Sequence, residues 1–168
     1  MGSTDDSAGF EKLLEETRKA LEPLDKALTL AYAPSGREEA FLNSVAPRHV
    51  DLMHSMAYDQ PTQKTGQHSS IDDAKAALRR ADPKMTLGLP FYGRDVHRGS
   101  QWTTYEDIVL MAQQSHSRSS HTPLASNQDN IGSLYFNGVD TIEKKVELAI
   151  DAGVSGVMIW EVGQDCRV

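Results

Sequence analysis

The stretch VDLMHSMAYD, residues 50–59, places the strongest constraint on what this chain can fold into. It is a run of apolar and small residues that ends in a tyrosine and a carboxylate. A strand buried on both faces of a parallel sheet has this pattern, with polar residues only at its end. Parallel α/β sheets bind ligands at the carboxyl ends of their strands, so Tyr58 and Asp59 are candidate site residues. Side chains alternate along a strand, which predicts Met56 and Tyr58 on one face and Asp59 on the other.

Strands and helices alternate along the rest of the chain. Apolar runs predict further strands at residues 26–33, 85–92 and 156–160, and a short one at 133–136. Amphipathic patterns predict helices at residues 9–21, 37–45, 70–80, 103–114 and 141–152. This order implies an α/β fold of about four parallel strands with flanking helices and right-handed crossovers. The four principal strands all finish in polar or aromatic residues, namely Tyr32, Tyr58 with Asp59, Tyr92 to Arg94, and Trp160 with Glu161.

The length of 168 residues fits one domain. Residues 1–8 are expected to be a disordered start, and residues 9–168 to form the folded unit. Residues 115–130 are rich in Ser, His, Asn and Gln and are expected to form a mobile insertion. Ser70 is predicted to cap one helix, Thr103 or Thr104 another with Glu106 completing a capping box, and Gly153 to end the last.

Composition narrows the classes of partner. The net charge of −7 argues against nucleic acid, which needs clustered Lys and Arg, and no apolar run is long enough to cross a bilayer. The first ten residues have no signal-peptide pattern, so the chain as written is expected to be cytoplasmic, although its localisation stays open. Cys166 is the sole cysteine, which excludes an internal disulfide. The six histidines, His116 and His121 among them, lack metal-ligand spacing, so neither a metal nor a cofactor is expected.

Three motifs occur in a recognisable order: MAYD at 56–59, LGLPFYGR at 87–94 and GVMIWEVGQD at 156–165. Together with YFNG at 135–138 and the Lys-containing helix that follows, they resemble the family 18 glycoside hydrolases, the chitinase-like (β/α)-barrels. The resemblance covers residues 9–168 and only the second half of that barrel. A complete barrel takes about 250 residues, so the resemblance implies a partial TIM-type barrel built from the family's fifth to eighth strands.

The family's signature D-x-x-D-x-D-x-E, which carries the proton donor, should lie just before the first helix. The sequence there is MGSTDDSA, and no glutamate in the chain has that aspartate pattern upstream. The general acid is therefore absent from these residues. Four strands alone would also leave the inner face of the barrel uncovered and two sheet edges unpaired. The half is expected to close with a second half-barrel, to misfold, or to be a fragment of a longer product.

The resemblance also implies a chemistry. Family members hydrolyse N-acetylglucosamine polymers by substrate assistance, in which the sugar's own acetamide attacks the anomeric carbon. Tyr58 would donate its hydroxyl to the acetamide oxygen, and Asp59 would hold the sugar or the tyrosine by hydrogen bonding. The other implied substrate contacts are Met56 in the acetamide pocket, Trp160 as an apolar floor, and Tyr92 and Arg94 along the saccharide. The implied partners are N-acetylglucosamine oligomers or chitin-like glycans.

Plainer interpretations of these residues stay open. Trp160 could be a core residue, Tyr58 a structural hydroxyl, and Arg94 part of a surface salt bridge. Glu161 is interpreted as a residue that orients the strand end, not as the acid, and His54 as an interior histidine with satisfied hydrogen bonds.

Three functions follow from the sequence. The first is a half-barrel that binds chitin-like glycans and is inactive alone. The second is a fragment of an active chitinase whose N-terminal half lies outside this sequence. The third is an interaction protein that self-associates or binds a partner through the exposed half-barrel face. The exact glycan, endo or exo action and the oligomeric state cannot be read from the sequence.

Overall fold

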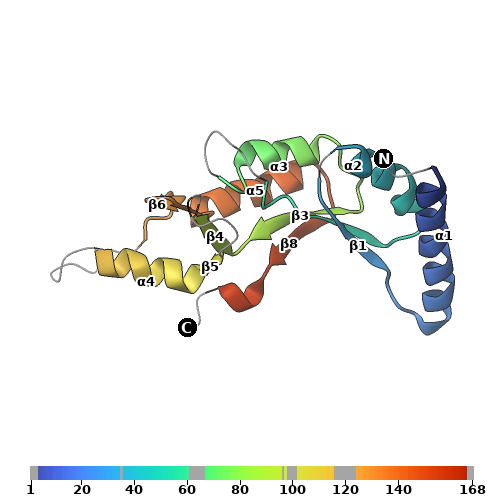
Figure 1. The fold of residues 1–168 in the computed structure, drawn as a ribbon, viewed down its shortest axis with the longest axis horizontal. Coiled ribbons are helices and arrows are strands. Elements are labelled where there is room, and N and C mark those ends of the chain that lie inside the picture. The colour runs from blue at the N-terminus through green and yellow to red at the C-terminus, as the bar shows by residue number, and fades with distance from the viewer. Residues whose placement is uncertain are drawn as a thin grey trace.

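The computed structural model describes residues 4–34, 36–60, 67–95, 97, 102–115 and 124–165. Its main sheet contains four parallel strands in the order β1-β2-β3-β8. These strands are β1 (Thr29–Tyr32), β2 (Leu52–Ser55), β3 (Met85–Pro90) and β8 (Gly156–Trp160). The strands alternate with helices along the chain, and both edges, β1 and β8, are unpaired within the described residues (Figure 1). The prediction of a partial TIM-type barrel with four parallel strands is confirmed.

The helices are α1 (Thr4–Leu21), α2 (Gly36–Val45), α3 (Ile71–Leu78), α4 (Tyr105–Ser115) and α5 (Val139–Asp151). Short 3₁₀ turns follow at η1 (Glu22–Leu24), η2 (Ala46–Arg48) and η3 (Val162–Gln164). Helix α1 begins at Thr4 and not at Gly9, so residues 4–8 are helical, while residues 1–3 lie outside the described part. No helix within the described ranges has the length and apolar character needed to span a membrane.

The main core lies between the sheet and the helices that cover one of its faces. Met53, Met85 and Leu87 point to this side and pack against the helices. Figure 1 shows α3 and α5 lying together over the sheet. Helix α5 contributes a buried stripe at a spacing of four residues, which consists of Thr141, Lys145 and Ala149.

A second, antiparallel sheet has the order β5-β4-β7-β6. It contains β4 (Tyr92–Asp95), β5 (Trp102–Thr104), β6 (Asn130–Ile131) and β7 (Leu134–Tyr135). The sequence predicted one strand through residue 92, but β3 ends at Pro90 and Tyr92 already belongs to the second sheet. The short strand predicted at residues 133–136 corresponds to β7. The rest of this sheet was not predicted, because strands of two to four residues are too short to show an alternating pattern. Half of the predicted mobile insertion, residues 116–123, lies outside the described part.

The helix caps agree in most details with the prediction. Ser70 caps α3, and Asp73 completes a capping box with it. Thr104 caps α4 by accepting a hydrogen bond from the backbone N–H of Asp107, so Asp107 takes the position that the sequence assigned to Glu106. Gly153 follows the end of α5 with φ of 68°, as a left-handed residue that ends a helix.

Candidate functional site

A tight corner, formed by residues 56–60, follows β2 where the sequence predicted a longer strand. The backbone N–H of Ala57 bonds to Ser55 and that of Tyr58 to Met56, so each bond spans only two residues. Asp59 then takes a positive φ of 58°. The predicted alternation of Met56, Tyr58 and Asp59 across a strand is therefore wrong, because the ladder ends at Ser55. Strained backbone of this kind persists where surrounding contacts hold it, often at functional sites.

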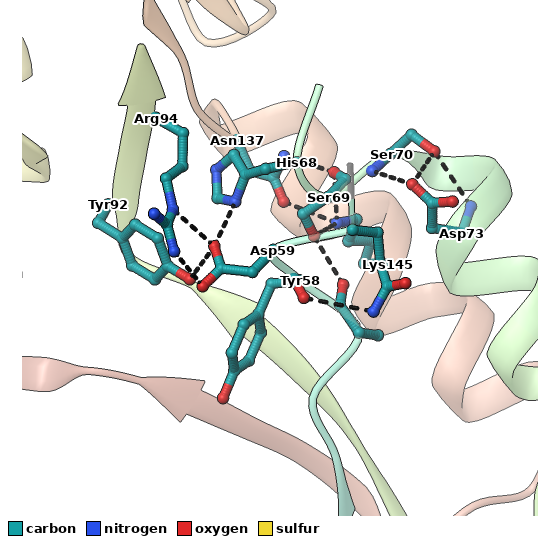
Figure 2. Close-up of polar contacts among 12 residues, drawn as sticks. Tyr58, Asp59, His68, Ser69, Ser70, Asp73, Tyr92, Arg94, Asn137 and Lys145 are labelled. Atoms are coloured by element: carbon teal, nitrogen blue, oxygen red, sulfur yellow. Dashed lines mark hydrogen bonds and ion pairs between the residues drawn. The ribbon is translucent and has the colours of Figure 1, made fainter. Parts of the chain in front are cut away.

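Tyr58 lies over β3, where only glycine leaves room for it. A Cβ atom on Gly88 would come within 2.4 Å of the Ser55 carbonyl oxygen and 2.7 Å of Tyr58 Cε1. The Tyr58 hydroxyl points away from Asp59 and has no hydrogen-bond partner among the described residues (Figure 2). Burial, helped by the charge of Asp59, raises the pKa of Tyr58 to about 12. The hydroxyl is therefore a protonated donor at neutral pH.

Asp59 is held from three directions, as Figure 2 shows. Its carboxylate accepts a hydrogen bond of 2.8 Å from the Tyr92 hydroxyl and a bidentate pair from Arg94. His68 Nδ1 lies 3.3 Å from Asp59 Oδ1. Burial works to raise the pKa of Asp59, but His68, Arg94 and Tyr92 outweigh it and hold this pKa well below its ordinary value. Burial and the bond to Asp59 also raise the pKa of Tyr92.

An aromatic cluster supports this carboxylate, and two of its members were missed by the sequence analysis. The Tyr92 ring stacks with the Trp102 ring at 5.1 Å between centroids. The centroid of the His68 ring also lies 5.1 Å from that of Tyr92. The Arg94 guanidinium lies 5.3 Å from the centre of the Trp102 ring. Trp102 is 47% exposed and forms the open end of the cluster. Both Trp102 and His68 belong to stretches without periodic pattern, so no sequence signal marked them.

A buried polar network lies behind the corner and was also missed. The Lys145 Nζ donates hydrogen bonds to the backbone oxygen of Ser69, to its hydroxyl and to Asn137 Oδ1, at 2.9, 2.7 and 2.7 Å. Burial lowers the pKa of Lys145 to about 7. A lysine beside a serine hydroxyl can activate a nucleophile, but Ser69 is buried and its hydroxyl donates to the Ala57 carbonyl. This pair is therefore closed to a substrate.

The structure brings four of the six predicted site residues together and places the other two separately. Tyr58, Asp59, Tyr92 and Arg94 form one connected cluster. Met56 is half-buried at the start of the corner, and its backbone oxygen accepts the Tyr58 N–H at 2.8 Å. Trp160 ends β8 in register with Pro90 and is 42% exposed, so it is not a core residue.

Three other predicted residues have structural roles. Tyr32 ends β1, but its side chain packs into the main core on the helix side and does not join the site at the carboxyl ends of the strands. His54 is half-buried, and its Nδ1 lies 2.7 Å from Thr86 Oγ1, which agrees with an interior histidine. Glu161 accepts a hydrogen bond from Gln164.

The described part of the chain contains no group of three or more His, Cys, Asp or Glu side chains arranged to hold a metal ion. His116, His121 and Cys166 lie outside the described residues.

Three solved structures share this fold. A chitinase from Bacteroides thetaiotaomicron superposes with a TM-score of 0.70 at 26% identity, covering 99% of this chain and 56% of the chitinase. A mutant class V chitinase from Nicotiana tobaccum, solved in complex with NAG4, gives 0.71 at 21% identity, with 98% and 62% covered. A mutant of catalytic domain 2 of the Ostrinia furnacalis Group II chitinase gives 0.70 at 18% identity, with 98% and 55% covered.

These comparisons also define how much of the family fold is present. The chain spans between 55% and 62% of the length of the three chitinase structures. No protein among the curated sequences matches it. The model of the glycosyl hydrolases family 18 matches residues 1–165. Because this match covers nearly the whole sequence, the protein belongs to family 18 of the glycosyl hydrolases.

Proposed function

We propose that this half-barrel binds N-acetylglucosamine oligomers or chitin-like glycans at the carboxyl ends of its strands, and that it does not hydrolyse them by itself. The observation that carries the proposal is the Tyr58 hydroxyl, which is protonated, has no partner among the described residues and belongs to the residue next to the fixed Asp59. Its support from relatives is that the tobacco chitinase was solved in complex with NAG4.

In the proposed complex, Tyr58 donates its hydroxyl to the acetamide oxygen of the bound sugar. Asp59 orients the site through Tyr92 and Arg94, both of which already donate hydrogen bonds to it. The exposed Trp160 ring offers an apolar floor to the sugar's C–H face, and Met56 lines the acetamide pocket. No glutamate of the sequence has the family's acid signature upstream, so the leaving oxygen has no proton donor from this chain.

Isothermal titration with N-acetylglucosamine oligomers tests the binding. Tyr58→Phe keeps the ring over Gly88 and removes only the hydroxyl, so it should weaken binding about fivefold, the worth of one neutral hydrogen bond. Tyr32→Phe is the matched control, since that tyrosine packs on the helix side of the sheet and should leave the affinity unchanged. Wild-type protein that releases no binding heat at any oligomer length would refute the proposal. Measurable turnover of a chromogenic chitobioside would refute its second part.

A second candidate is an active chitinase in which this chain supplies only the C-terminal half. The length relation favours it, because the related chitinases are nearly twice as long. Co-expression with a family 18 N-terminal half-barrel that carries D-x-x-D-x-D-x-E would decide. Chitobioside turnover by the combined halves, and by neither half alone, supports this candidate.

A third candidate is association through the open sheet. The edges β1 and β8 have no neighbouring strand within the described residues, and Ala31 and Trp160 are exposed on the face opposite the helices. Two copies could in principle complete an eight-stranded barrel by pairing β8 of one with β1 of the other. Such a pair would still lack the acid, because both copies have the same sequence.

A further inference from the structure

Lys145 is a fully buried amine that the proposed sugar chemistry does not use. Its side chain is 0% exposed, and its three hydrogen-bond acceptors are all neutral groups, contributed by Ser69 and Asn137. The charged groups that act on it are Asp73 on α3 and Asp129 before β6. Moving an amine from water into the protein interior costs free energy, which its hydrogen bonds offset only in part. The network is therefore a poor way to gain stability alone.

The network leads directly to the Tyr58–Asp59 corner (Figure 2). The Ser69 hydroxyl accepts from Lys145 and donates 2.8 Å to the carbonyl of Ala57, the residue before Tyr58. His68, next to Ser69, lies against Asp59, and its carbonyl accepts the Gln60 N–H at 2.9 Å. Residues 68–69 therefore bridge α5 to both ends of the corner.

Asn137 closes the network on its other side. Its Nδ2 donates 2.9 Å to the Ser69 backbone oxygen, while its Oδ1 accepts from Lys145. Ser69 is therefore held through both its hydroxyl and its carbonyl by groups from α5 and the segment before it. With Ser69 fixed, the hydrogen bond to Ala57 is fixed too.

We infer that Lys145 is a positioning residue that, acting through Ser69, holds Tyr58 and Asp59 in the geometry of the site. The identity of the ligand at the corner rests on the proposed function. The role of Lys145 in holding the corner does not depend on it. A positioning lysine and a purely structural lysine predict different results. A purely structural lysine would change the unfolding midpoint and leave the corner of the folded protein as it is.

The test measures the corner directly, without a ligand. Ring signals of Tyr58, Tyr92 and His68 are followed by NMR in folded protein labelled at tyrosine and histidine. Lys145→Met and Ser69→Ala are both expected to shift these signals, because Ser69→Ala removes the bond to the Ala57 carbonyl and Lys145→Met removes the bonds that fix Ser69. Ser69→Ala keeps the lysine and serves if Lys145→Met does not fold.

Each variant has a matched control. Ser70→Ala makes the same substitution one residue away, but Ser70 caps α3 and makes no bond to Ala57. Lys84→Met removes a lysine that also bonds two carbonyl oxygens, those of Pro47 and Val50 at the other end of the strands. Both controls should lower the unfolding midpoint and leave the three ring signals in their wild-type positions.

Ring signals that stay at wild-type positions in folded Ser69→Ala or Lys145→Met would overturn the inference, and so would equal shifts in the controls. Titration with an N-acetylglucosamine oligomer adds a second readout. If wild type binds, the two corner variants should bind about fivefold or more weakly while both controls bind normally. If wild type does not bind, the proposed function fails, whereas the ring signals still decide the role of Lys145.

Discussion

The site depends on a glycine that leaves room for a ring and on an aspartate with an unusual backbone conformation. Gly88 has no Cβ, which lets the Tyr58 ring lie directly on β3. Asp59 has a positive φ, and Tyr92, Arg94 and His68 hold its carboxylate there. Each residue therefore has a role that can be changed by a single substitution.

Gly88→Ala should displace the Tyr58 ring, because the added methyl would lie 2.7 Å from Tyr58 Cε1 and 2.4 Å from the Ser55 carbonyl oxygen. Overpacking of this kind costs about 1–3 kcal/mol of unfolding free energy, and binding of N-acetylglucosamine oligomers should fall with it. Urea denaturation and calorimetric titration measure the two effects. Gly9→Ala, in open space on α1, is the control and should be neutral or slightly stabilising. Unchanged stability and affinity in Gly88→Ala would show that Tyr58 does not need its observed place.

The lowered pKa of Asp59 predicts that the free energy of unfolding decreases at acid pH. Its pKa is lower in the folded protein than in the unfolded chain, so it contributes stability that is fully present above about pH 4 and is lost as the pH falls below that. Asp59→Asn should therefore show a smaller loss of unfolding free energy between pH 7 and pH 3 than wild type. Denaturant titrations at the two pH values measure this difference. Equal losses in both proteins would contradict the direction given for this carboxyl.

At the scale of elements, the sequence predicted what periodicity and capping can encode. The buried strands, the amphipathic helices and the Ser70 cap followed from local pattern. Most of the second sheet did not, because its strands have two to four residues and its central pair, β4 with β7, joins segments far apart in the chain. His68, Trp102 and Lys145 were missed because their contacts span 8 to 76 positions along the chain and leave no local mark.

Helix α5 carries a buried lysine whose ionisation should affect the stability of the whole protein. The pKa of Lys145 is about 7 when folded and near 10.5 when unfolded, so between these values the unfolded chain binds a proton that the folded chain lacks. The free energy of unfolding should therefore rise between pH 7 and pH 9 more in wild type than in Lys145→Met. Urea denaturation across this range provides the measurement. Parallel curves for the two proteins would show that Lys145 keeps its charge when buried.

At the scale of the whole molecule, the sheet is covered on one face, and its edge strands β1 and β8 have no neighbouring strand in the part of the chain that the structure describes. Helices α3 and α5 pack over one side (Figure 1). Trp160, at the end of β8, is exposed on the other side. Unpaired parallel edges and exposed apolar groups favour association with another chain. The isolated chain should therefore sediment at a mass above the 18.5 kDa of one copy. A well-folded monomer at micromolar concentration would contradict this prediction.

The central proposal is that Tyr58, in the corner after β2, and Trp160, at the end of β8, hold one sugar at the carboxyl ends of the strands. An NMR titration with a short N-acetylglucosamine oligomer, following the Tyr58 ring and the Trp160 indole, tests it most directly. The account predicts that both signals shift and saturate along one binding curve, while the Tyr32 ring on the helix side stays constant. Signals of Tyr58 and Trp160 that remain in place at saturating oligomer would contradict it.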